Sequence, residues 1–138
     1  MAAFEETSQM LHLQMRSYWI FTPVEYENAG EFTPPREQPW VRFRIYEEPS
    51  EQQGMGMTNL TRNWGRVVVQ VFIPVYRGPD AGRQLASLVA QVFSRQVIGA
   101  QPVGKIQCRT ASVEAIGKSE AWYQHNVTVP FYRTTIGT

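Results

Sequence analysis

The sequence is poor in the residues that build disulfides and metal sites. It has one cysteine, Cys108, so no disulfide can form within the chain. It has only two histidines, His12 and His125, and one cysteine with two histidines is a weak basis for a zinc site. It also has no apolar run near the roughly 20 residues that a membrane-spanning helix requires. A disulfide scaffold, a metal site and a membrane-spanning protein are therefore not expected.

Lysine is nearly absent, and the chain carries almost no net charge. Eleven arginines and two lysines, Lys105 and Lys118, face 12 acidic residues, which leaves a net charge of +1. Nucleic-acid-binding domains usually carry a basic patch or stripe, so the composition does not favour that class. Arginine is enriched and lysine depleted in protein–protein interfaces, but a GC-rich genome would give the same bias.

The first residues lack the basic and apolar regions of a secretory signal peptide, and Glu5 and Glu6 place negative charge there instead. We therefore expect the protein to be made and used in a cytoplasm.

No group of residues predicts catalysis. Neither histidine lies in a pattern that would activate a serine or cysteine nucleophile. Cys108 falls in a strand-like segment, where a small buried side chain is expected. The acids Glu47, Glu48 and Glu51 cluster at the end of a predicted strand, which favours the solvated base of a loop over an acid/base pair. We expect no catalytic, cofactor-binding or metal-binding residues, no cofactor and no enzyme activity.

The stretch from Trp64 to Ser94 organises the predicted fold. Residues 65–74 are almost continuously apolar and rich in valine, which predicts a central strand buried on both faces. A turn at residues 75–80 precedes a helix from Ala81 to about Ser94, whose apolar residues recur at helical spacing along one face.

Weaker patterns predict the flanking elements. A first helix runs from Phe4 to about Tyr18 with Phe4, Leu11, Met15 and Tyr18 on one face, and a short edge strand covers residues 23–26. Strands follow at Trp40–Glu48, Lys105–Ile116 and Ala121–Arg133, with connectors at 97–104 and 117–120. The prediction is one α+β domain over residues 1–138, in the order α-β-β-β-α-β-β. Its single mixed, mainly antiparallel sheet has four to five strands, and two helices pack on one face.

A polar segment of about fifteen residues, Pro49–Asn63, separates two of these strands. Loops of that length inside a compact domain are usually functional or disordered. Met55 and Met57 near its middle have soft, adaptable side chains that suit a contact surface.

Several segments in this order resemble the tail-terminator family of long-tailed bacteriophages. The resemblance covers about residues 4–133 and rests on an N-terminal helix, the pair Phe32-Thr33-Pro34-Pro35 and Pro39-Trp40-Val41-Arg42, the strand from Trp64 to Pro74, the segment from Gly78 to Ala86, and the segment from Trp122 to Phe131. The spacing of the first pair and of the strand carries most of the weight.

The resemblance implies a virion structural protein. Members of that family form a hexameric ring on the finished tail tube, stop its polymerisation and present the surface that joins the head. The implied partners are other copies of the chain, the tail tube protein and a head–tail connector protein. DNA would pass through the ring without sequence-specific binding, and no membrane is involved. The implied location is the tail or neck of the virion, assembled in the host cytoplasm. A head–tail connector or tail-completion protein of the same neck region is the alternative, and an oligomeric module for single-stranded nucleic acid is a more distant one.

Two sets of residues are hypothesised to make these contacts. The first set, in the long loop, would reach an axial neighbour: Met55, Met57, Asn59 and Arg62. The second set, on the exposed sides of neighbouring strands, would lie between subunits: Arg42, Arg44 and Arg66. A disordered loop and an ordinary solvated face are the competing explanations.

Overall fold

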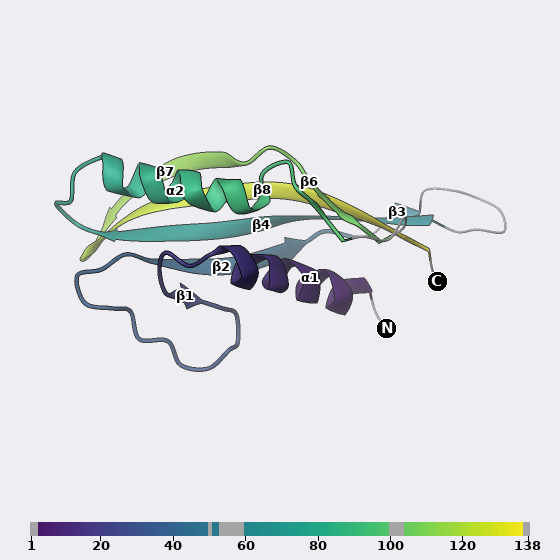
Figure 1. Ribbon diagram of the computed structural model, residues 1–138, viewed down its shortest axis with the longest axis horizontal. Coiled ribbons are helices and arrows are strands. Elements are labelled where there is room, and N and C mark those ends of the chain that lie inside the picture. The colour runs from purple at the N-terminus through teal and green to yellow at the C-terminus, as the bar shows by residue number, and fades with distance from the viewer. Residues whose placement is uncertain (1–2, 50, 53–59, 100–103, 137–138) are drawn as a thin grey trace.

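The computed structural model describes residues 3–49, 51–52, 60–99 and 104–136, which form two helices and one eight-stranded sheet (Figure 1). In chain order the elements are α1 (Ala3–Tyr18), β1 (Val24–Glu25), β2 (Trp40–Glu47), β3 (Glu51–Gln52), β4 (Leu60–Pro74), α2 (Asp80–Phe93), β5 (Val97–Ile98), β6 (Ile106–Cys108), β7 (Ser112–Ser119) and β8 (Trp122–Ile136). The α+β class is confirmed. The predicted count of four to five strands and the predicted element order are wrong.

Two long strands, β4 and β8, form the centre of the sheet. They pair antiparallel along their whole lengths, from Leu60 opposite Ile136 to Pro74 opposite Trp122. The sheet order is β1-β2-β4-β8-β6-β5, with β3 paired to the start of β4 and β7 paired to β8. Only β1 and β2 pair in parallel; the other described pairs are antiparallel. The sheet is therefore mixed and mainly antiparallel, as predicted.

One apolar core lies between the sheet and the two helices. Alternate residues of β2, β4 and β8 turn inward, because successive side chains of a strand point to opposite faces. Helix α1 contributes Leu11 and Met15, and α2 contributes a stripe from Ala86 to Phe93. Phe43 of β2 packs against Phe93 of α2, with ring centroids 5.8 Å apart. Both helices thus cover the same face of the sheet (Figure 1).

The other face of the sheet, here called the open face, carries no helix in the described part of the chain. On β4 it presents Arg66, which is exposed, and Val68 and Gln70, which are half-buried. The prediction that this strand is buried on both faces is therefore wrong over most of its length. A valine-rich run has enough β propensity to form a central strand whether or not its second face is covered.

Aromatic rings cover one end of the open face. Trp40 stacks on Phe72 with centroids 4.2 Å apart and meets the edge of Trp122 at 6.0 Å. Phe32 packs against Trp40 at 5.1 Å, so it holds the proline-rich segment that precedes β2 against the sheet. Another tryptophan, Trp64, lies inside β4, which begins four residues earlier, at Leu60.

The predicted strand Lys105–Ile116 is two strands, β6 and β7, which pair with different parts of β8. The break lies beside Pro130 of β8, whose carbonyl accepts a hydrogen bond from the backbone N–H of Arg109. A strand residue directs its N–H and C=O to the same side, so the missing N–H of Pro130 falls at this break. The expected turn at 117–120 is also shorter, since β7 continues to Ser119 through a bulge between Ala115 and Gly117.

Other element boundaries differ in smaller ways. The predicted loop 49–63 contains β3 and the start of β4, and the predicted connector 97–104 contains β5. Leu11 and Met15 of α1 are buried as expected, but Tyr18 is 63% exposed and Trp19 takes its place in the core. Trp19 follows the helix, and its backbone N–H donates a hydrogen bond to the Met15 carbonyl. Trp19 therefore lies one helical turn after Met15, on the same buried face.

Candidate assembly surfaces

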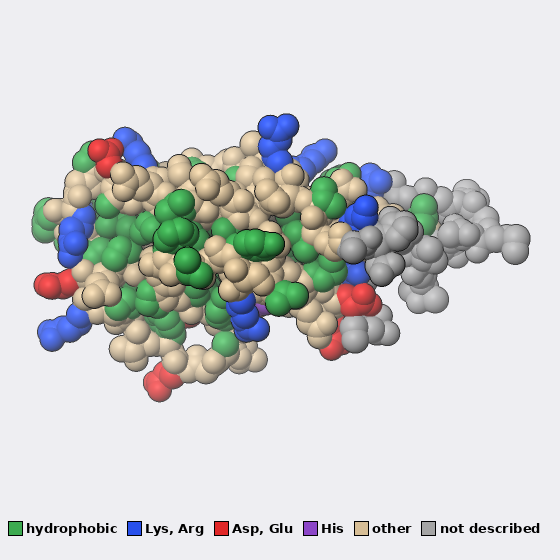
Figure 2. Space-filling view, viewed as in Figure 1, with side chains coloured by type: hydrophobic (Ala, Val, Ile, Leu, Met, Phe, Trp, Pro, Cys, Tyr) green, Lys and Arg blue, Asp and Glu red, His purple; other side chains and the backbone are tan. Residues whose placement is uncertain are grey.

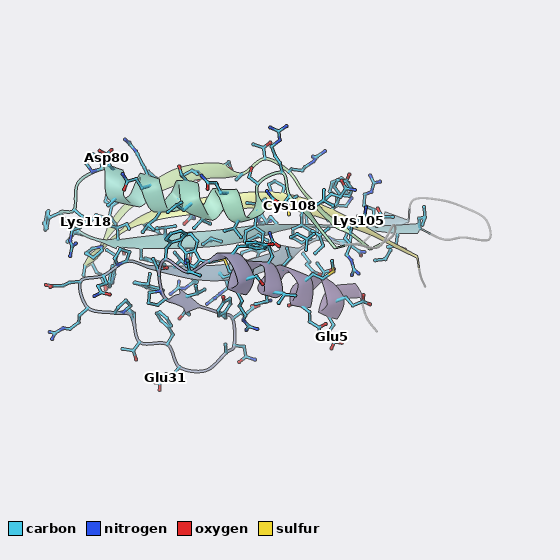
Figure 3. All side chains as sticks on the ribbon, in the orientation of Figure 1. Glu5, Glu31, Asp80, Lys105, Cys108 and Lys118 are labelled. Carbon is cyan, nitrogen blue, oxygen red and sulfur yellow. The ribbon has the colours of Figure 1, made fainter. Side chains whose placement is uncertain are left out.

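Cys108 and His12 have surroundings that are typical of structural residues. Cys108 lies inside the body of the molecule (Figure 3), and burial raises the pKa of its thiol to about 12. The thiolate, which is the nucleophilic form, is therefore scarce at neutral pH. His12 donates a hydrogen bond from Nδ1 to the Ser8 carbonyl at 2.8 Å. Within the described ranges, no three His, Cys, Asp or Glu residues are grouped so that they could hold a metal ion.

Two of the three arginines predicted at subunit contacts are bonded within the chain. Arg42 Nε lies 2.5 Å from Glu25 Oε1, and Arg44 Nη2 lies 3.0 Å from the same oxygen. Partial burial alone would raise the pKa of Glu25, but hydrogen bonds and charge from both arginines outweigh it and lower the pKa. Since Glu25 belongs to β1, this shared carboxylate ties β1 to the open face of β2.

The third arginine, Arg66, is exposed near the middle of the open face. Its guanidinium carbon lies 4.8 Å from the ring centroid of Tyr46, its partner across the β2–β4 ladder. No salt bridge involves Arg66 among the residues that the structure describes. Its hydrogen-bond donors are therefore more available to another molecule than those of Arg42 and Arg44.

Of the four residues predicted at the axial contact, Met55, Met57 and Asn59 lie outside the described residues. Arg62 lies on β4 with its guanidinium carbon 4.8 Å from the ring centroid of Tyr132 and 5.7 Å from that of Trp64. Its Nε is buried and has no hydrogen-bond partner in the described part of the chain. Stacking on two aromatic rings thus holds this side chain in place.

The Arg62 site is larger than the sequence indicated. Trp64 and Tyr132 lie side by side with centroids 5.3 Å apart, and the guanidinium of Arg109 lies 5.7 Å from the Trp64 ring. We call Arg62, Trp64, Arg109 and Tyr132 the arginine–aromatic cluster. Tryptophan, tyrosine and arginine are the residue types that most often dominate binding energy at interfaces. The alternation of β4 could have placed Arg62 and Trp64 on one face, but the register with β8 was needed to add Tyr132.

A cavity of about 270 Å³ lies between the β4–α2 turn and the β7–β8 hairpin. Its lining is mainly apolar and includes Ile73, Pro79 and Tyr123, with Ala115 of β7 beside them. His125 also lines it, is 4% exposed, and has a buried Nδ1 without a hydrogen-bond partner in the described ranges. Burial lowers the pKa of His125 and the charge of Arg83 lowers it further, so the ring is neutral at neutral pH.

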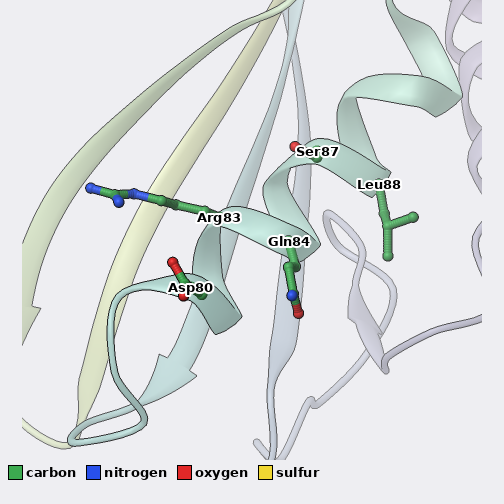
Figure 4. Close-up of a pocket in the computed structure, with 5 residues that line it drawn as sticks. All are labelled: Asp80, Arg83, Gln84, Ser87 and Leu88. Carbon is green, nitrogen blue, oxygen red and sulfur yellow. The ribbon is translucent and has the colours of Figure 1, made fainter.

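A second, more open hollow of about 520 Å³ runs along α2. Figure 4 shows its lining from the first two turns of the helix: Asp80, Arg83, Gln84, Ser87 and Leu88. Most of these side chains are polar and exposed, and their spacing is that of the outward face of a helix. This hollow has the character of a solvated surface.

Apolar side chains reach the surface in two further places. One group lies on α1 and in the turn that follows it: Leu13, Tyr18, Ile20 and Phe21. The other lies at the 270 Å³ cavity and on the neighbouring strand: Tyr76 and Tyr123 line the cavity, and Val113 and Ile116 are exposed on β7. Figure 2 shows several apolar side chains exposed on the helical side of the molecule. No described helix is both long enough and apolar enough to cross a membrane.

Comparison with known proteins gives a matching family model and eight matching chains of solved structures. None of the curated proteins searched matches this chain. One solved structure, whose title states no function, covers 97% of this chain and 94% of its own, with a TM-score of 0.62 and 17% sequence identity. That likeness shows a shared fold. A family model described as "Phage tail terminator protein" matches residues 2–131, which is nearly the whole sequence. The chain belongs to the phage tail terminator protein family, as its sequence pattern indicated, and is a structural protein of the phage tail.

Proposed function

We propose that this protein forms a ring, hexameric by resemblance to its family, that caps the phage tail tube. The ring ends tube polymerisation and provides the surface to which the DNA-filled head is joined. The match of the family model over residues 2–131 is the observation that carries the proposal. The tail tube protein below and a head–tail connector protein above are the neighbours, and DNA passes through without base-specific contacts.

The mechanism is one of shape and surface. A closed ring needs a heterologous contact, in which one patch of each copy meets a different patch of the next, with a rotation that returns to the start. One ring face must match the last ring of the tube. The opposite face must not accept another ring of tube protein, because otherwise growth would continue.

Removal of the gene from the phage, with complementation from a plasmid, tests the proposal. We expect tails of excessive and variable length without heads, seen by electron microscopy, and restoration of normal virions by the plasmid copy. Tails of normal length that fail to join heads would instead support a connector or tail-completion protein. Normal infectious virions would reject both assignments.

We propose that the axial contact is made by the segment Glu51–Arg62, with Met55, Met57 and Asn59 in the loop and Arg62 at its base. The arginine–aromatic cluster supports this placement, because it gives the end of the sheet next to the loop a rigid set of stacked side chains. Deletion of residues 53–59 is expected to abolish tail capping in an assembly assay while the purified protein stays folded. Capping at the normal level would reject the loop.

Arg62→Ala tests the anchor of the cluster, and Arg36→Ala, at an exposed position in the segment before β2, is the matched control. Loss of a hot-spot arginine typically costs 2 kcal/mol or more, about a thirtyfold change in affinity for tube ends. The control variant is expected to bind as the unchanged protein does. If both variants bind tube ends equally well, Arg62 does not take part in the axial contact.

We propose that Arg42, Arg44 and Arg66 supply polar contacts between subunits, with Arg66 the most available of the three. Arg66→Glu is expected to weaken ring formation, measured as the assembled mass by native mass spectrometry. Arg42 and Arg44 need a separate control, because their replacement also releases Glu25 and β1. Rings of unchanged mass and stability from Arg66→Glu would count against this set.

A further inference from the structure

Among the residues that the structure describes, two apolar surfaces have no partner, and the two differ in shape. One is concave: the 270 Å³ cavity, with Tyr76 and Tyr123 exposed at its rim. Its lining is mainly apolar but also includes Arg77, Arg83 and the buried ring of His125. The other is convex: the turn between α1 and β1, where Ile20 is 82% exposed and Phe21 is 54% exposed. Side chains of this size are seldom left so exposed together without a binding role.

The convex turn is held rigidly in its exposed position. Trp19, which is buried, packs edge-on against Phe21 with centroids 5.1 Å apart. The indole N–H of Trp19 donates to Thr22 Oγ1 at 3.0 Å, which closes the turn from the other side. A segment fixed in this way loses little conformational entropy on binding, so a larger part of its contact energy is available for association.

The two surfaces cannot meet within one chain. The convex turn leads into β1, the first strand of the sheet order, whereas the cavity lies beside β7, which pairs with the far side of β8. Four strand spacings separate β1 from β7, which is about 19 Å. The strand order therefore places the two surfaces toward opposite edges of the sheet.

This arrangement matches what a ring subunit requires. A heterologous contact joins two different patches, and patches at opposite edges of a subunit let each copy bind one neighbour on either side. An interface in which the convex turn met the convex turn of a second copy, or the cavity met the cavity, would instead give a closed dimer. The edge strand β7 adds to the concave side, since among the described strands it pairs with β8 alone and its residues 112–116 and 118–119 are exposed.

We propose that Ile20 and Phe21 of one copy insert into the cavity beside β7 of the next copy, and that this contact closes the ring. The inference rests on the proposed ring function and goes beyond it by naming the two surfaces and their occupant. The occupant is a second copy of this chain. The apolar part of the lining, which includes Ile73, Pro79 and Tyr123, takes the two side chains, and the neighbouring exposed edge of β7 is covered by the same contact.

Ile20→Asp tests the convex side without disturbing the fold, because the side chain is mostly exposed. Leu13→Asp is the matched control, since it is the same kind of change at another exposed apolar position, on α1 itself. We expect Ile20→Asp to raise the concentration needed for ring assembly by tenfold or more. The control is expected to assemble normally and both variants to keep the original melting curve as monomers.

Cross-linking tests the pairing itself. Ile20→Cys and Ala115→Cys are combined in one chain and treated with a short bismaleimide; the buried Cys108 contributes no background, since burial keeps its thiol protonated. We expect a ladder of covalent multimers ending at the ring size. Val97→Cys with Ala115→Cys is the control pair, because Val97 is exposed on β5, away from the convex turn, and it is expected to give no ladder.

The outcomes separate this inference from the function on which it rests. Rings seen by electron microscopy, alone or on tube ends, together with no ladder from the test pair or with normal assembly of Ile20→Asp, would overturn the inference and leave the ring intact. If no rings form, either from the protein alone or on tube ends, and the phage that lacks the gene makes normal tails, both the inference and the proposed function are wrong.

Discussion

The contact between Gly82 and His125 makes a sharp prediction, because the usual effect of a glycine-to-alanine change is reversed there. Gly82 lies in the first turns of α2 and is buried. Replacement of a helical glycine by alanine normally stabilises a helix by about 1 kcal/mol. A Cβ added at Gly82, however, would lie 2.6 Å from Nδ1 of His125 and closer still to its Cε1.

The balance of the two effects gives the expected sign. Overpacking of a filled core costs about 1–3 kcal/mol. The ring of His125 borders the 270 Å³ cavity and can shift only partly into it, which favours the middle of that range, about 2 kcal/mol. After the helix propensity gain is subtracted, Gly82→Ala should destabilise the protein by about 1 kcal/mol, since clash and propensity oppose each other.

A double-mutant cycle with His125→Ala isolates the clash. In that background the added methyl group has space, so Gly82→Ala should stabilise the protein by about 1 kcal/mol and the coupling energy should be near 2 kcal/mol. Urea unfolding of all four proteins at one concentration gives the free energies, because ring formation would make stability depend on concentration. If Gly82→Ala stabilises the protein that retains His125, or if the coupling energy is near zero, Gly82 and His125 do not pack together as described.

Three further predictions follow from buried positions. Gly65→Ala should destabilise by about 2 kcal/mol or more, because a Cβ there would lie 2.7 Å from both Phe131 Cζ and a backbone carbonyl; a urea midpoint unchanged from the original would contradict this. Because burial and then Arg83 lower the pKa of His125 below 6.5, its contribution to stability is present above pH 6.5 and is lost as the pH falls through the lowered pKa. His125→Gln should remove that part of the pH dependence of unfolding, and an unchanged pH profile would argue against it. Cys108, with its pKa raised to about 12, should react with a thiol reagent only as fast as the protein unfolds; rapid labelling of the folded protein would show that the thiol is accessible.

Periodicity predicted the elements that carry their own pattern. Val41 and Phe43 in β2 and Val127 and Val129 in β8 alternate with polar residues in the sequence, and all four are buried on the core side of the sheet. The stripe of α2 was predicted in part, since Val89, Val92 and Phe93 are buried whereas Leu85 and Leu88 are only partly buried. Such patterns are local, because a strand repeats every two residues and a helix every 3.6.

Elements without a pattern of their own were missed. The strands β3 and β5 have two residues each and exist only through pairing with β4 and β6. The division between β6 and β7 depends on Pro130, which is remote in sequence and becomes a neighbour through the register of β8. No window of sequence around Lys105–Ile116 contains that information.

The candidate surfaces were predictable in the same limited way. Alternation placed Arg42, Arg44 and Arg66 on one face of the sheet, which the strand register supports. It could not indicate that Glu25 engages two of them, since β1 lies 17 residues before Arg42 in the chain. The arginine–aromatic cluster likewise combines β4, β8 and the residue after β6.

The sequence by itself determined the family, the α+β class and the approximate positions of the two helices and of β2, β4 and β8, because ordered motifs and hydrophobic periods are properties of contiguous residues. Only the tertiary structure decided which arginines are engaged within the chain, where the convex turn of Ile20 and Phe21 lies, and that a cavity opens beside β7 at the opposite edge. The physical reason is that each of these features joins residues from different strands and helices, and their distances depend on strand register and helix packing.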